Sequence, residues 1–201
     1  MYQFKDIGGL TRVAIGATWV SMVTNVLADG RNFYAVTFLD RSPDQRATWP
    51  DAAPDLLNLF VLIVSVILIG RWIHRASANA HTMTADLPIS PGWAVGWYFV
   101  PIANLWKPFA GMKQIWLASR YGSNWEGGVA TDLLNWWWGL WILDGVLNNA
   151  SWRLDSKVPQ FAANIDLVEI FVDIALSLIL IRIMRQIRDA QKLTRHAEVF
   201  A

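Results

Sequence analysis

The chain has 201 residues, a length that fits a single domain. It is 54% hydrophobic, contains 13 tryptophans and has a mean hydropathy of +0.29, which is typical of a protein partly embedded in lipid. A net charge of +1 gives no electrostatic footprint for nucleic acid, so no nucleic-acid partner is expected. Because the sequence has no cysteine, it excludes a disulfide framework, a thiolate metal site and a cysteine nucleophile.

The first predicted membrane span covers residues 10–29. Basic Lys5 and Arg12 precede an apolar run that also contains Asn25. No small-x-small cleavage pattern lies at a suitable distance from this run, so we interpret it as a retained span rather than a signal peptide.

The second predicted span, residues 55–74, is the most apolar segment of the chain. About 20 apolar residues, each rising about 1.5 Å, cross a hydrocarbon core of about 30 Å. Pro54 is expected near the start of this helix, because a proline in the first turn removes no internal hydrogen bond. The segment ends in basic side chains that can reach the lipid headgroups: Arg71, His74 and Arg75.

Two further spans are predicted at 130–149 and 165–184, with Asn164 capping the last helix. The basic, amphipathic tail at 185–201 is predicted to lie on anionic lipid. The expected fold is therefore an all-α membrane protein, a single domain over 1–201 with four transmembrane helices. No internal repeat of the kind found in many secondary transporters is visible.

A broken apolar segment separates the second and third spans. Residues 87–116 contain four prolines and four tryptophans. Gly92 to Trp106 would measure only about 22 Å as an unbroken helix, and Pro101 would interrupt it. We expect a broken re-entrant or interfacial segment at about 91–117; in the re-entrant form, Asn79 or Asn104 would supply the missing hydrogen bonds.

The distribution of Lys and Arg favours cytoplasmic termini in a multi-pass membrane protein. With four spans, 12 basic residues lie inside and 5 outside, whereas a fifth span gives 11 against 6. The inside set is Lys5, Arg12, Arg71, Arg75, Lys107, Lys113, Arg120, Arg182, Arg185, Arg188, Lys192 and Arg195, and the outside set is Arg31, Arg41, Arg46, Arg153 and Lys157. The same topology predicts an aromatic belt at the cytoplasmic interface, formed by Trp72, Trp93, Trp97, Trp106, Trp116, Trp125, Trp136, Trp137 and Trp138.

Several short motifs follow one another through the centre of the chain. They are an Arg-Ala-x-x-Asn element, a Pro-Gly-Trp-Ala-Val-Gly-Trp run, Phe-x-Pro-Ile-Ala-Asn, Leu-Trp-Lys-Pro and Trp-Trp-x-x-Trp. Their most distinctive residues are Arg75, Asn79, Pro91, Gly92, Trp93, Gly96, Trp97, Pro101, Asn104, Trp106, Lys107, Pro108, Trp137, Trp138 and Trp141. In these motifs, over about residues 56–188, the chain resembles the uncharacterised bacterial membrane family catalogued as domain-of-unknown-function family 4328. The resemblance implies a multi-spanning helical protein of the bacterial inner membrane and brings no catalytic residues.

Polar residues within the predicted spans form a candidate cation or proton site near the outer end of the bundle. Asp166, Glu169 and Asp173 share one helical face. They can converge with polar residues of other spans, namely Asn25, Asn58, Asp144 and Asn148. Two simpler interpretations remain open. The dipole at a helix start can favour acidic side chains such as Asp166 and Glu169, and Asp144 can hydrogen-bond across a helix interface. On this topology the acidic groups lie far from the broken segment.

No spacing of His, Ser or Gly indicates a catalytic, metal or cofactor site. The sequence therefore favours a non-enzymatic scaffold or accessory subunit that packs in the lipid bilayer with copies of itself or with a larger membrane complex. The alternative is a small transporter or channel component that uses the acidic site.

Overall fold

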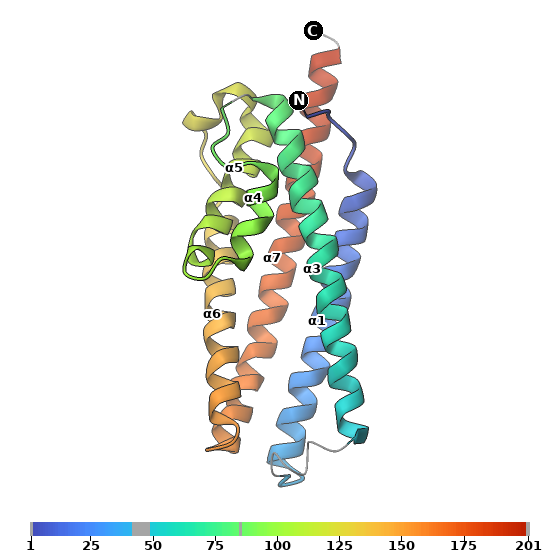
Figure 1. Cartoon of the computed structure of the whole chain (residues 1–201), viewed down its shortest axis with the longest axis vertical. Helices are drawn as coiled ribbons and strands as arrows, with labels where there is room; N and C mark the ends of the chain where they lie inside the picture. The colour runs from blue at the N-terminus through green and yellow to red at the C-terminus, as the bar shows by residue number, and fades with distance from the viewer. Residues whose placement is uncertain (1, 42–48, 85, 200–201) are drawn as a thin grey trace.

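The computed structural model describes residues 2–41, 49–84 and 86–199, with side chains described for 2–41, 53–84 and 86–194. Every element in these ranges is helical. The long helices are α1 (Gly8–Thr37), α3 (Trp49–Met83), α6 (Asp132–Leu154) and α7 (Pro159–Val199). They form an elongated bundle with both termini at the same end (Figure 1). Arg46, in the predicted outer loop between the first two predicted spans, lies outside the described part, as does the side chain of Arg195.

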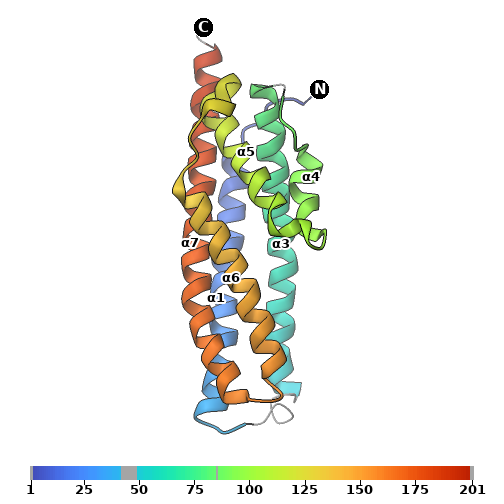
Figure 2. The ribbon, with the colours of Figure 1, turned by 90° about the vertical axis from the view of Figure 1, so that its left-hand side faces the viewer.

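Helix α7 is the central element of the bundle. It packs against α1 on one side and α6 on the other, and α1 packs in turn against α3. The short helix α4 (Pro91–Gly96) and helix α5 (Lys107–Tyr121) lie beside the halves of α3 and α7 nearest the termini (Figures 1 and 2). The 3-10 helices η1 (Trp97–Phe99), η2 (Ala103–Leu105) and η3 (Gly122–Gly127) complete the connections around α5.

The helices extend beyond the predicted spans at the end away from the termini. Because α1 continues to Thr37 and α3 begins at Trp49, much of the predicted outer loop is helical. Pro54 therefore lies inside α3 and not at its start. An ion pair between Arg31 and Asp55 joins α1 to α3 near this end.

Helix α7 corrects two further predictions. It is one continuous helix of 41 residues, so residues 185–199 continue the bundle helix and do not form a separate surface segment. Ile187 and Gln191 in this part are fully buried. The helix begins at Pro159, so Asn164 lies within it and cannot cap its start.

Two helices are candidate membrane spans by length and hydropathy among the described residues, α1 and residues 53–83 of α3. In the apolar 18-residue stretch of each helix, only 28% of the residues of α1 and 17% of those of α3 are buried in the bundle, whereas the core helix of a soluble protein is mostly buried. The exposed side of α3 is a continuous apolar surface formed by Leu56, Leu57, Leu59, Phe60, Leu62, Ile63, Val66 and Ile67. Such a surface is suited to lipid rather than water.

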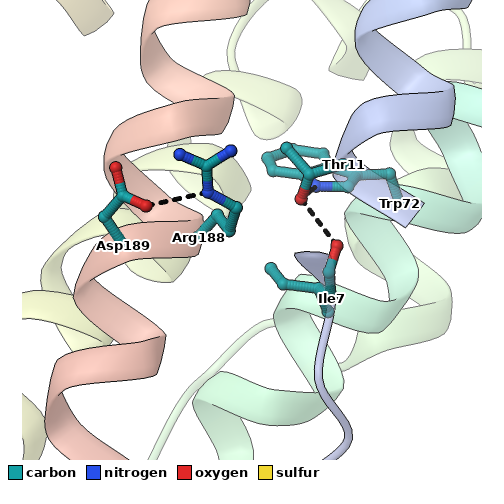
Figure 3. A network of polar contacts seen from close by, with 5 residues as sticks. All are labelled: Ile7, Thr11, Trp72, Arg188 and Asp189. Atoms are coloured by element: carbon teal, nitrogen blue, oxygen red, sulfur yellow. Dashed lines mark hydrogen bonds and ion pairs between the residues drawn. The ribbon is translucent and has the colours of Figure 1, made fainter. Parts of the chain in front are cut away.

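The hydrophobic core lies in the half of the bundle nearest the termini, where α3, α5, α6 and α7 meet. Trp72 is completely buried there, and its indole Nε1 donates to Thr11 at 3.0 Å. The Thr11 hydroxyl donates in turn to the carbonyl of Ile7, 2.8 Å away, which holds the start of α1 against α3 (Figure 3). The Arg188–Asp189 ion pair of α7 lies near this contact (Figure 3).

The predicted tryptophan belt is wrong for three of its members. Trp72, Trp116 and Trp137 are at most 6% exposed and pack in the core. By contrast, Trp93, Trp106 and Trp136 are at least 50% exposed and are free to contact lipid. An indole pattern in the sequence cannot separate these roles, because both a core and a membrane interface accommodate the same ring.

Asn79 is the centre of a buried polar network at the terminal end of the bundle. Its Oδ1 accepts from the Lys5 backbone N–H at 3.1 Å and from Arg75 at 3.0 Å. Its Nδ2 donates to the Lys5 carbonyl at 2.8 Å and to Gln191 at 2.9 Å. Gln191 also donates to the Ala76 carbonyl and to the Ser119 hydroxyl, each at 2.9 Å. The network thus joins the N-terminal segment, α3, α5 and α7.

Replacing Asn79 with Ala removes the four hydrogen bonds of its side chain and leaves donors and acceptors on three segments without these partners. We expect the free energy of unfolding to fall by about 3 kcal/mol, since each unsatisfied buried polar group costs about 1–3 kcal/mol. The measurement is the thermal unfolding midpoint of the detergent-solubilised protein. Asn149→Ala, at an exposed position of α6, is the matched control, and equal midpoints for the two variants would contradict this role.

Candidate functional site

The broken segment forms a helical hairpin. Helix α4 and helix α5 pack against each other and against α3, and the chain reverses between them. At the reversal Ile102 has a φ of +68°, and the Ala103 N–H donates to the Pro101 carbonyl at 2.7 Å. This is a classic γ-turn, which is rare and strained for a β-branched residue. The reversal explains why a stretch too short to cross a membrane has two helical arms.

Two side chains from neighbouring helices fix the hairpin. Gln114 of α5 accepts from the Ile89 N–H at 3.0 Å and donates to the Ile89 carbonyl at 2.8 Å. The indole of Trp138 on α6 donates to the Leu105 carbonyl at 3.1 Å. The proposed role of Asn79 is therefore wrong, because its amide is engaged in the network at the terminal end. No described hydrogen bond involves the side chain of Asn104; its backbone N–H donates to the Val100 carbonyl.

Aromatic contacts join the hairpin to α6 and so give the tryptophan motif of α6 a structural role. Trp138 and Trp141 stack at 4.7 Å between ring centroids. Tyr98 of η1 meets Trp141 edge-on at 6.2 Å, and Phe109 of α5 lies 6.2 Å from Trp138. Such pairs contribute about 0.5–1.5 kcal/mol each beyond the area they bury.

A second aromatic contact lies within the hairpin itself. Trp93 and Trp97 stack at 4.4 Å, and the Lys107 ammonium lies 5.5 Å from the Trp97 ring centroid. The exposed residues of the turn are apolar: Phe99 is 68% exposed and Ile102 is 72% exposed. A strained turn with an apolar tip is suited to a lipid environment, whereas water would favour polar residues there.

The acidic cluster lies in the other half of the bundle, between α1, α6 and α7. Asp166 of α7 is 5% exposed and accepts hydrogen bonds from the Asn32 amide on α1 and the Ser151 hydroxyl on α6. Asp29 of α1 lies close enough to Asp144, Asp166 and Asp173 for their carboxylates to repel its own electrostatically. We define the acidic cluster as Asp29, Asp144, Asp166, Glu169 and Asp173.

The deeper members of the cluster are poorly compensated. Glu169 is 5% exposed, and the groups that act on it are the four aspartates of the cluster, with no basic side chain among them. The carboxylate of Asp173 interacts with Asn25 and Ser177. Its Oδ2 atom is buried and has no hydrogen-bond partner. Several uncompensated carboxylates in an apolar bundle are costly unless they bind protons or cations.

The structure brings together four of the five predicted site residues, namely Asn25, Asp144, Glu169 and Asp173. It places Asn148 on the exposed surface of α6. Asn58, also expected to converge on the site, lies beside Arg31 and Thr24 where α3 meets α1.

The simpler account of Asp166 and Glu169 as acids favoured by a helix start is wrong. Because α7 begins at Pro159, both lie beyond its first turn, and both are buried.

Asp29 and Asn32 were missed by sequence reasoning. Asp29 follows Asn25 by four residues, so it projects from the same side of α1. Asp29 is the last residue of the first predicted span, where a loop was expected to begin, so it was not considered as a site residue. Asn32 lay beyond that end and offered no sequence signal of its own.

A cavity of about 370 Å³ connects the two features. It is lined mainly by apolar and aromatic side chains from α3, α5, α6, α7 and the hairpin, among them Tyr98 and Trp141. Asp144, a member of the acidic cluster, also lines it, as does Ser177, which hydrogen-bonds to Asp173. The buried hydroxyl of Tyr98 has no hydrogen-bond partner. The hairpin and one member of the acidic cluster, Asp144, therefore border one space, although the acidic groups were expected to lie far from the broken segment.

The fold and these motifs define an all-helical protein with two candidate membrane spans and a hairpin inserted beside them. The family model described as Domain of unknown function (DUF4328) matches residues 37–191, and the chain belongs to this family. The match covers α3, the hairpin and α6, together with α7 as far as Gln191, while nearly all of α1 precedes it. No curated protein and no solved structure matches the chain.

Insertion of the hairpin into the membrane can be tested by cysteine labelling, because the sequence has no native cysteine. Ile102→Cys and Arg120→Cys both place a thiol at an exposed position. In inside-out membrane vesicles we expect a membrane-impermeant maleimide to label Ile102→Cys several-fold more slowly, because lipid rather than protein covers the turn. Labelling in SDS provides the common end point. Equal rates in vesicles would instead place the hairpin on the membrane surface.

Proposed function

We propose that this chain is a four-span membrane protein that binds protons at the acidic cluster and exchanges them with the central cavity, as a small transporter or channel component. The observation that carries the proposal is the burial of Glu169 and of the Asp173 Oδ2 atom beside three further carboxylates, with no basic side chain acting on either residue. Ionisable groups at membrane depth are rare and mark ion pathways and proton relays.

Four spans are supported by the way α6 and α7 pack. Helix α7 packs against α1 on one side and α6 on the other, and the polar residues of the cluster lie between these three helices. Their outer surfaces carry exposed apolar residues such as Val146 at 60% and Phe171 at 67%. An inside that is polar and an outside that is apolar is the arrangement expected in lipid. With both termini at one end, the excess of basic residues at that end favours cytoplasmic termini.

A proton is favoured over a metal ion as the bound species. Within the described ranges, no three acidic or histidine side chains converge closely enough to hold a metal. Protons need only carboxyl groups that can share them through hydrogen bonds, and Asn25, Ser177 and Ser151 already supply such partners. The cavity beside Asp144 gives these groups a space through which a proton carrier or water can approach.

The combined variant Asp144→Asn and Asp173→Asn keeps the size of both side chains and removes their ability to exchange protons. In proteoliposomes with an imposed membrane potential, we expect its proton flux to fall to the level of protein-free vesicles. The flux is followed with a pH-sensitive dye in the lumen. Asp6→Asn combined with Asp86→Asn is the matched control, because both carboxylates are exposed outside the cluster. Unchanged flux in the cluster variant, or a flux carried by sodium, would contradict the proposal.

Exposed tryptophans on α6 favour a second candidate, a scaffold or accessory subunit. Trp136 is 65% exposed and Trp152 is 79% exposed, and such rings are common anchors in protein interfaces. On this proposal the chain exists in its native membrane as a homo-oligomer or within a larger complex.

The mass of the native particle extracted in mild detergent tests the second candidate. A scaffold is expected to purify with a stoichiometric partner, or with further copies of itself that are lost in Trp136→Ala. Ile102→Ala is the control, because it also removes an exposed apolar side chain. A particle containing a single copy of this chain and nothing else would contradict the scaffold proposal.

A further inference from the structure

A second hollow lies where α4 meets α3 near the terminal end, and it shares Val66, Gly70, Val95 and Phe99 with the central cavity. This groove has a volume of about 650 Å³. Its lining combines an apolar wall with a basic rim and includes no acidic residue. The wall is formed by Val66, Ile67, Val95 and Phe99, and the rim by Arg71, His74 and Arg75.

The charges of the rim are not neutralised by the protein. Arg71 and His74 are exposed, and no ion pair or hydrogen bond joins either side chain to another group in the described part of the chain. Arg75 uses one guanidinium nitrogen to donate to the Gln3 carbonyl and to Asn79. Its Nε is buried and has no partner. Three basic side chains on adjacent turns of α3 therefore face a groove that contains no counter-charge.

The arrangement of charge and apolar surface matches that of a phospholipid. Ile67 precedes Arg71 by four residues, so the wall lies about one helical turn, or about 5 Å, from the rim along α3. The wall faces the same direction as the lipid-suited surface of α3, where Ile67 is 54% exposed. A free anion would be recognised by the rim alone and would gain nothing from the apolar wall.

We propose that this groove binds one anionic phospholipid, with its phosphate held by Arg71, His74 and Arg75 and its acyl chains along the wall. The α4 arm of the hairpin forms one side of the site, so the bound lipid holds α4 against α3. This site is independent of the acidic cluster, which lies between α1, α6 and α7.

Native mass spectrometry of the full-length protein in detergent, titrated with phosphatidylglycerol or phosphatidylcholine, tests the proposal. We expect phosphatidylglycerol to bind more tightly, and Arg71→Gln to weaken it about fivefold, the loss expected for one interfacial cation. Arg182→Gln is the control, since it removes an exposed basic residue of α7 that does not line the groove. Its affinity for phosphatidylglycerol should match that of the wild type.

A second variant tests the wall without changing charge. A Cβ added at Gly92 meets no atom within 4 Å, so Gly92→Leu is tolerated by the backbone while its side chain enters the groove. We expect it to weaken binding of both lipids. Three outcomes would overturn the proposal: equal affinity for the two lipids, an equal loss in Arg182→Gln, or displacement of phosphatidylglycerol by glycerol 3-phosphate, which would assign the rim to a free phosphate.

Discussion

Every polar group inside this bundle must find its partner within the protein, because the outer faces of the long helices are apolar. Unsatisfied backbone or side-chain groups in such surroundings cost several kcal/mol each. The Asn79 network meets this requirement at the terminal end by joining four segments through one amide and one glutamine. It also explains the Arg-Ala-x-x-Asn motif. Arg75 and Asn79 hold the N-terminal segment against α3, and the carbonyl of the fully buried Ala76 accepts a hydrogen bond from Gln191.

The same requirement shapes the hairpin. Reversal of the chain leaves backbone groups of the hairpin without partners in a helix. Side chains of α5 and α6 supply these partners. Gln114 satisfies both backbone groups of Ile89 before α4, and Trp138 satisfies the Leu105 carbonyl after the turn. The family motif on α6 therefore packs against the hairpin, although η3 separates the two in sequence. Its stacked rings also form a wall of the cavity that reaches Asp144.

The acidic cluster is where the requirement is not fully met. Asp166 has two neutral donors, but Glu169 and one oxygen of Asp173 lack comparable partners. Uncompensated carboxylates at this depth point to function rather than to packing. The lipid groove presents the opposite deficit, a set of basic side chains without anions, and no member of the acidic cluster lines it. The two sites would thus take ligands of opposite charge.

The sequence by itself determined that this is an all-helical chain, where its two candidate membrane spans lie, that residues 87–116 are broken, and which family it belongs to. These properties depend on hydropathy, proline and short motifs, which act locally along the chain. It also identified most of the acidic residues, because helical periodicity shows which side chains share one face.

Only the tertiary structure decided what each face meets. It placed Asp29 in the cluster and Asn148 outside it, buried three tryptophans expected in lipid, and made the C-terminal tail part of α7. Periodicity fixes the direction of a side chain around its own helix axis but not the neighbouring helix that it faces. That choice depends on contacts between residues far apart in the sequence, and these form only when the helices pack.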